Sequence, residues 1–205
     1  MVFLCKEKAI KAYLILFISS SKSSFDLKPI SSFSTLPSFI KSKYGIYYVY
    51  GNHDKNNYSF NKNYNVYELN KIIENNNINI LEEDKKYIRN DLVIIGRGYD
   101  YRLHIDDILS DSDIDLYKVV IDHIPQDYEI NELNNIDLEL SGHTHNGQIF
   151  PLGIIERLFK TSDLIYGKKT INDFTGIVTS GIAGWGLNIR TEGNSEYVII
   201  NLQKK

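Results

Sequence analysis

Four of the five histidines in this 205-residue chain follow short apolar segments of the kind that form buried strands. His53 comes after the first such segment, His123 after a later one, and His143 and His145 after the next. Loops that leave the ends of sheet strands are where a rigid scaffold presents reactive side chains, and several strands can deliver them to one crevice. Because histidine is the commonest metal ligand in proteins, the pattern predicts a shared site that could hold a metal ion.

The spacing of His143 and His145 adds to this prediction. In an extended segment residues i and i+2 point the same way, so two imidazoles would lie on one face, close enough for one metal ion or an adjacent pair. An amide oxygen, such as that of Asn52, suits hard or borderline divalent ions. We therefore count Asn52 with the histidines.

Each of these groups has a simpler explanation when it is taken alone. An isolated His-x-His pair is more often solvated or hydrogen-bonded than bound to a metal. Gly51-Asn-His-Asp54 could be an ordinary turn, since Gly, Asn and Asp are turn residues. His123 could be a plain loop residue, and we interpret His104 as a surface histidine. The groups favour a site because they occur in series, each after an expected strand.

Apolar periodicity indicates the elements that position these side chains. Residues 46–50 are β-branched and aromatic and end at a glycine, which predicts a buried strand. Apolar residues between 66 and 73 recur at helical spacing, and the asparagines at 75–77 end that helix. A second helix carries a one-sided apolar stripe made of Ile154, Ile155, Leu158 and Phe159. Further strands are expected at 78–81, 92–95, 119–121, 138–140, 177–178 and 198–202.

These elements favour a layered α/β or α+β sandwich over a barrel. Strands outnumber helices, and continuous apolar runs imply strands buried on both faces. A chain of 205 residues has room for one domain with a real core but not comfortably for two. We expect residues 43–205 to form that domain and residues 1–42, which are rich in serine, to form an atypical segment of strand and loop.

Composition and charge exclude several classes of partner. The formal net charge is −3, with Lys and Arg scattered, so we expect no nucleic acid partner. The single cysteine, Cys5, cannot form an internal disulfide, which favours a reduced, cytoplasmic setting. The apolar run at 12–18 is too short to span a bilayer and lacks a clear cleavage site, so we expect no integral membrane segment.

The series of polar motifs resembles the calcineurin-like metallophosphoesterase family. It consists of Gly51-Asn-His-Asp54, then His123-x-Pro125, then Gly142-His-Thr-His-Asn-Gly-Gln148. Within that family the chain is most similar to a bacterial branch with the motif SGHTHGGQ and a terminal GxGxxGxxxR stretch, here Gly181–Arg190. The resemblance covers about residues 43–202. It implies a four-layer αββα sandwich and two-metal hydrolysis of a phosphomonoester, phosphodiester or pyrophosphate bond.

The resemblance also implies which residues bind metal. Asn52, His123 and His143 resemble ligands of one ion, and His145 resembles a ligand of the other. Family members use divalent metal ions such as Mn²⁺, Fe²⁺ or Fe³⁺, Zn²⁺ and Mg²⁺. Two ions about 3.5–4 Å apart can clamp both oxygens of an in-line displacement. The metal centre that the resemblance implies therefore holds two ions in family members.

Two further residues acquire catalytic roles by the same resemblance. His53 resembles the histidine that protonates the leaving-group oxygen, and Asp54 resembles the carboxylate that orients its ring. Arg190 could bind a substrate phosphate, although a surface salt bridge is an equal alternative. Asn146 stands where the related branch has glycine, and we expect it to adopt the left-handed conformation that the turn needs.

Two family motifs have no counterpart in this sequence. The family carries an Asp-x-His on its first strand and a Gly-Asp on its second, whose aspartate bridges the two metals. Here no histidine precedes His53, no glycine precedes Gly45, and the only acids among the first 53 residues are Glu7 and Asp26. One ion would keep three protein ligands while the other keeps His145 alone, so we expect at most one well-bound ion.

Three explanations of this loss stay open. The chain could be the C-terminal portion of a longer enzyme, with residues 1 to about 40 partly non-native and the missing part supplied by a longer native chain. It could be a degenerate member, or a partner chain could complete the site. We expect an αββα sandwich that lacks its usual first strands, and an impaired metal-dependent phosphoester hydrolase. The alternative is a non-catalytic domain that binds a metal or a partner.

The expected substrate is a phosphorylated small molecule or a lipid-linked phosphate. The expected location is the cytoplasm, or the periphery of the membrane.

Overall fold

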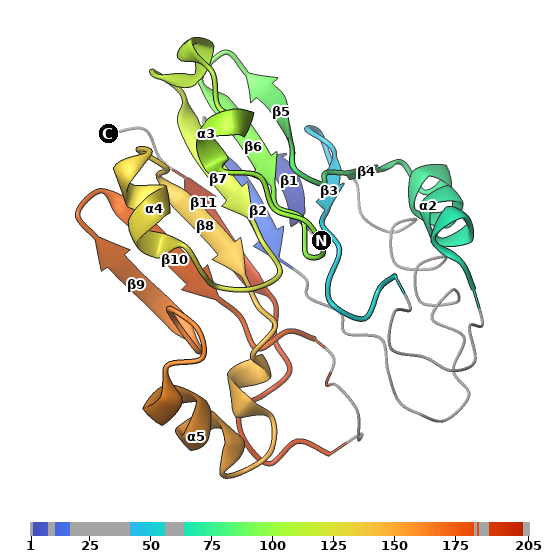
Figure 1. Cartoon of the computed structure of the whole chain (residues 1–205). Helices are drawn as coiled ribbons and strands as arrows, with labels where there is room; N and C mark the ends of the chain where they lie inside the picture. Colours follow the sequence, from blue (N-terminus) through green and yellow to red (C-terminus); the bar gives the residue numbers. More distant parts are fainter. Residues whose placement is uncertain are drawn as a thin grey trace.

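The computed structural model describes residues 2–7, 11–16, 42–55, 64–182, 184 and 189–202 (Figure 1). Most of the serine-rich stretch expected in residues 1–42 lies outside these residues. The described part forms two sheets with helices on their outer faces. The predicted α/β class is confirmed.

The first sheet has five strands in the order β11-β2-β1-β3-β4. β1 pairs antiparallel with both β2 and β3, β2 pairs antiparallel with β11, and β3 pairs parallel with β4. The sheet therefore joins strands from both ends of the described sequence. Its strands are β1 (Val2–Glu7), β2 (Lys11–Leu16), β3 (Ile46–Tyr48), β4 (Ile78–Ile80) and β11 (Val198–Leu202).

The second sheet has six strands in the order β5-β6-β7-β8-β10-β9. The four inner strands run parallel, and the two edge strands run antiparallel to their neighbours. Because the inner strands are parallel, their carboxyl ends lie along one edge of the sheet. The strands are β5 (Asp84–Arg89), β6 (Leu92–Gly96), β7 (Tyr117–Ile121), β8 (Leu138–Ser141), β9 (Gly167–Ile171) and β10 (Phe174–Val178).

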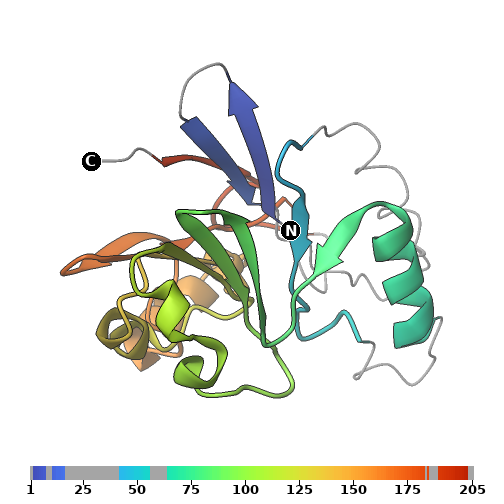
Figure 2. The same ribbon diagram turned by 90° about the horizontal axis from the view of Figure 1, so that it is seen from above.

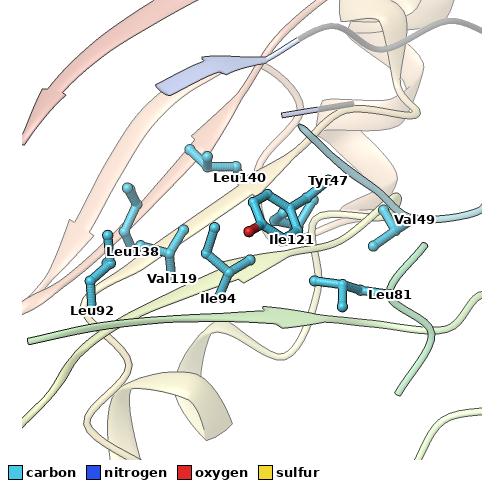
Figure 3. Packing of buried hydrophobic residues seen from close by; sticks show 9 residues of the cluster. All are labelled: Tyr47, Val49, Leu81, Leu92, Ile94, Val119, Ile121, Leu138 and Leu140. Atoms are coloured by element: carbon cyan, nitrogen blue, oxygen red, sulfur yellow. The ribbon is translucent and has the colours of Figure 1, made fainter. Parts of the chain in front are cut away.

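The two sheets face each other across one apolar core (Figure 3). Tyr47 and Val49 from the β3 segment and Leu81 after β4 pack against side chains of the second sheet. The residues that face them are Leu92, Ile94, Val119, Ile121, Leu138 and Leu140. Alternate residues of each strand reach opposite faces, so the same strands also present side chains to the helices outside.

Helices cover the outer faces of both sheets. α2 (Val66–Asn75) packs on the first sheet through Leu69 and Ile73, on the side away from the second sheet (Figure 2). α3 (Ile105–Ile108) and α4 (Tyr128–Leu133) cover the second sheet. The layers therefore follow the order αββα. The remaining helical turns are η2 (Asp111–Asp113), η3 (His145–Gly147) and α5 (Leu152–Phe159).

Local signals explain where α2 begins and ends. Asn65 accepts a hydrogen bond from the Glu68 amide at 2.9 Å, and the Glu68 carboxylate accepts one from the Asn65 amide at 2.9 Å. This capping box satisfies two amide groups that a helix start otherwise leaves open. Asn76 caps the other end. The predicted helix and its asparagine stop are confirmed.

The apolar stripe of α5 is exposed, contrary to the usual orientation of such a stripe. Ile154 and Ile155 are 45% and 41% exposed, and Leu158 and Phe159 are 74% and 77% exposed. The buried residue is Gly153, whose α-carbon lies 2.3 Å from where a Cβ on Gly147 would be. The helix touches η3 through its glycine, and the stripe consequently lies away from that contact.

No helix within the described residues is long and apolar enough to cross a membrane.

Burial of Ile94 between the sheets yields a stability prediction. Ile94 is fully buried in the core between the sheets, whereas Ile114 is 70% exposed. Ile94→Ala should lower the free energy of unfolding by about 2–5 kcal/mol, and Ile114→Ala by less than about 0.5 kcal/mol. Urea unfolding of both variants measures the difference. Equal losses would contradict the packing described for the two sheets.

Candidate metal centre

The predicted site residues come together at the carboxyl ends of strands from both sheets. Asn52 and His53 follow β3 in the first sheet, while His123 follows β7 and His143 follows β8 in the second. Ligands of open α/β sheets bind outside the carboxyl ends of the strands. The site therefore lies where the facing sheets bring these loops together.

Three donor atoms converge around the ring of His123. Its Nε2 atom lies 3.0 Å from Oδ1 of Asn52 and 3.0 Å from Nδ1 of His143. The rings of His123 and His143 meet edge to face, with centroids 4.8 Å apart. Two donor atoms bound at right angles to one cation, each at about 2.1 Å, are themselves about 3.0 Å apart. The spacing of these side chains therefore suits a shared cation.

The donor groups around His123 carry no formal charge. Among the residues that the structure describes, no three His, Cys, Asp or Glu side chains form a group that could hold a metal ion. The third donor beside His123 and His143 is instead the amide oxygen of Asn52. Imidazole nitrogens with one amide oxygen favour borderline ions such as Zn²⁺, Fe²⁺ or Co²⁺ over hard ions, which need anionic oxygens.

His145 lies nearby with its orientation fixed by the backbone. Its Nδ1 atom is 3.2 Å from the carbonyl oxygen of Ser180, and the residue is 2% exposed. A carbonyl oxygen only accepts hydrogen bonds, so Nδ1 of His145 carries the proton. In the neutral ring Nε2 then holds the lone pair. Metal-binding histidines commonly donate their second ring N–H to such a carbonyl.

Burial, followed by repulsion from neighbouring imidazoles, lowers the pKa of His123 and of His143. The pKa of His123 is well below its usual value, first because the ring is buried and then because His143, His145 and His53 would repel its charge. Burial, followed by the effect of His53, also lowers the pKa of His143. His123 and His143 therefore retain lone pairs at neutral pH.

Asp54 is buried beside His53 and closes the turn that carries it. One oxygen of the Asp54 carboxylate accepts a hydrogen bond from the Gly51 amide at 2.6 Å. The Tyr64 hydroxyl donates to the Asp54 carbonyl at 2.9 Å. The expected role of Asp54 in orienting the His53 ring stays a prediction.

Gly51 is required because a side chain at this position would clash with the His123 ring. A Cβ on this residue would lie 2.7 Å from Cε1 of His123, closer than real Cβ contacts come. The His123 ring therefore packs directly on the backbone of the β3 loop. Sequence reasoning treated Gly51 as a turn residue, but its bare α-carbon makes room for the histidine.

The loop that carries His143 and His145 is not extended, so that expectation was wrong. After β8 the backbone bends and enters η3, and both histidines have positive φ values, 66° and 50°. Asn146 is left-handed, with φ of 53° and ψ of 36°, and Gln148 also has a positive φ of 52°. The left-handed conformation expected at Asn146 is confirmed. Such backbone is costly for residues other than glycine and persists where surrounding contacts hold it.

Arg102 and Tyr99 are neighbours of the site that sequence reasoning missed. The Arg102 guanidinium donates to Asp122 at 2.8 Å and to Asp127 at 2.7 Å, which ties down the loop containing His123. Tyr99 presents its ring edge-on to His123, with centroids 6.0 Å apart. Tyr99 could have been suspected because it follows β6, whereas the pairing of Arg102 with two distant acids leaves no sequence signal.

Arg190 also lies at the edge of this region. Its guanidinium donates to the backbone carbonyls of Ser180 and Asn194, at 3.3 and 3.2 Å. Ser180 is the residue whose carbonyl accepts the hydrogen bond from His145. The expected contact of Arg190 with a substrate phosphate stays a prediction.

Comparison with known proteins adds independent information. Residues 20–147 match the family described as calcineurin-like phosphoesterase. The chain is 34% identical over 116 residues to an uncharacterized metallophosphoesterase of Campylobacter jejuni, and 34% identical over 108 residues to one of Helicobacter pylori. It is 30% identical over 132 residues to one of Aquifex aeolicus. No solved structure was found to match.

The matched regions are partial on both sides. They cover 56% of this chain and 30% of the Campylobacter protein, and 52% of this chain and 29% of the Helicobacter protein. For the Aquifex protein the shares are 58% and 48%. The chain thus spans less than half the length of these relatives.

The lowered pKa of His123 yields a pH prediction for the metal-free protein. An unfolded histidine takes up a proton near pH 6.5, whereas folded His123 stays neutral to well below that pH. The unfolded chain then binds more protons, so folding stability should fall as the pH drops below about 6.5. His123→Gln should make stability less dependent on pH. Thermal unfolding in EDTA between pH 5 and 8 measures this, and an unchanged dependence would contradict the burial of His123.

Proposed function

Because this chain belongs to the calcineurin-like phosphoesterase family, we propose that its histidine site binds a divalent cation and hydrolyses phosphoester bonds. The observation that carries the proposal is that Oδ1 of Asn52 and Nδ1 of His143 each lie 3.0 Å from Nε2 of His123. The chain covers less than half of its relatives, so the proposal concerns the site rather than the activity of a whole protein.

The side chains divide into binding and proton-transfer roles. Asn52, His123 and His143 would hold one cation, and Nε2 of His145 would contribute to a second position. A divalent cation supplies Lewis acidity to a phosphoryl oxygen when it is bound there. His53, on the β3 loop beside these ligands, would donate a ring proton to the departing alkoxide oxygen. Asp54 would keep the His53 loop in place through its bond to the Gly51 amide.

We propose that this chain alone hydrolyses its substrate slowly. The converging donors are two imidazoles and an amide, and within the described part of the chain no group of three His, Cys, Asp or Glu side chains adds a carboxylate that could bridge two cations. Neutral donors bind hard ions such as Mn²⁺ and Mg²⁺ weakly, so one borderline ion per chain is the expected loading. The substrate class is a phosphorylated small molecule or a lipid-linked phosphate, and we propose a cytoplasmic location.

The neutral donor set also supports a second candidate function. A site that holds one ion but cannot clamp two oxygens would serve as a non-catalytic module that binds a metal or a partner. The two candidates differ in turnover, because only the hydrolase cleaves a phosphoester and only that reaction depends on His53.

The function test combines metal content with turnover. We expect about one Co²⁺ per chain, and slow hydrolysis of bis(p-nitrophenyl) phosphate above the rate of free Co²⁺. His123→Ala should lose the ion. His53→Ala should keep the ion and lose at least about 100-fold in rate, the lower end for removal of a general acid. The exposed His104 provides the matched control, since His104→Ala should change neither.

Each other outcome decides against part of the proposal. Stoichiometric Co²⁺ without turnover would favour the non-catalytic module. Absence of Co²⁺ binding would reject both the hydrolase and a module that binds a metal. Hydrolysis with Mn²⁺ as fast as with Co²⁺ would contradict the argument from missing carboxylates.

A further inference from the structure

The carbonyl oxygen of Ser180 lies between His145 and the last described loop of the chain. It accepts a hydrogen bond from Nδ1 of His145 at 3.2 Å and one from Nη2 of Arg190 at 3.3 Å. Both Ser180 and His145 are almost completely buried. Since the carbonyl decides which ring nitrogen of His145 holds the proton, whatever fixes Ser180 also fixes the tautomer of His145.

The Glu196 carboxylate fixes the peptide units around Ser180. One of its oxygens accepts hydrogen bonds from the Ser180 amide at 3.0 Å and from the Thr179 hydroxyl at 2.9 Å. The other accepts from the Tyr166 hydroxyl at 2.8 Å. In return the Glu196 amide donates to the Gly181 carbonyl at 2.9 Å. Residues 179–181 are therefore held from both the amide and the carbonyl side.

Residues next to Arg190 also form hydrogen bonds with Gln148, at the far end of the loop that carries His143 and His145. The amides of Thr191 and Glu192 donate to the Gln148 carbonyl at 2.8 and 3.0 Å. The Gln148 side chain, which is fully buried, donates to the Ile189 carbonyl at 3.1 Å. These bonds hold the end of the loop that carries His145 against residues 189–192.

We propose that Glu196 and Arg190 are positioning residues, which hold the Ser180 carbonyl against His145 so that Nε2 of its ring keeps the lone pair. The proposal rests on the proposed function for the use made of that lone pair. Arg190 acts through the backbone, since two of its nitrogens donate to the Ser180 and Asn194 carbonyls. Glu196 acts on the amide side of Ser180, through the peptide unit that precedes the carbonyl.

The test reads the tautomer of His145 in metal-free, ¹⁵N-labelled protein by long-range ¹H–¹⁵N correlation NMR. The resonance is assigned by its loss in His145→Gln. We expect the Nδ1–H tautomer in the native chain and a shift toward the Nε2–H tautomer, which free neutral imidazole prefers, in Glu196→Ala. Glu196→Gln should restore Nδ1–H, because its amide oxygen can still accept from Ser180 and Thr179.

Two further variants keep the test decisive. Arg190→Met keeps the apolar stem, loses both carbonyl contacts and should shift the tautomer in the same direction, which serves if Glu196→Ala does not fold. Glu132→Ala is the matched control, because Glu132 accepts one side-chain hydrogen bond from Asn172 and should leave His145 unchanged.

An unchanged tautomer in folded Glu196→Ala and Arg190→Met would overturn the proposal. So would an equal shift in Glu132→Ala. Because the NMR measurement needs neither metal nor substrate, the proposal can fail while the proposed hydrolysis stands, and the reverse.

Discussion

The packing of one sheet on the other is the constraint on which the site depends. Asn52 comes from a loop of the first sheet, and His123 and His143 come from loops of the second, yet the donor atoms of Asn52 and His143 each lie 3.0 Å from Nε2 of His123. That separation is set by the apolar side chains between the sheets, including Val49 and Ile121 just before these loops (Figure 3). Stacked sheets lie about 10 Å apart, so loops from both are needed to close the gap. The core is thus the scaffold of the site as well as the source of stability.

The site combines several energetically unfavourable features that a purely structural loop does not need. His123 is buried and held neutral among other imidazoles, and His143 and His145 adopt left-handed backbone. Compensation comes from close contacts, since Gly51 leaves room for the His123 ring and Arg102 ties down its loop. Strain and unfavourable titration gathered in one place are typical of functional sites.

The sequence predicted the parts of the fold that depend on local patterns. The inner strands and α2 follow from apolar runs and caps, and the left-handed Asn146 follows from the tolerance of asparagine for that geometry. Edge strands β5 and β9 were not predicted because each carries two adjacent lysines and few apolar residues. The loop of His143 was wrongly expected to be extended, and the hydrogen bonds of Glu196 to residues 179–181 were missed. Both depend on contacts between residues far apart in the chain, which local periodicity does not encode.

The most direct test of the central claim locates a single bound ion. Crystals of the protein loaded with one equivalent of Zn²⁺ can be measured at the zinc absorption edge. The account predicts one anomalous peak about 2.0–2.2 Å from Nε2 of His123, Nδ1 of His143 and Oδ1 of Asn52. A peak bound only by residues outside this group, or His123 and Asn52 too far apart to share one ion, would contradict it.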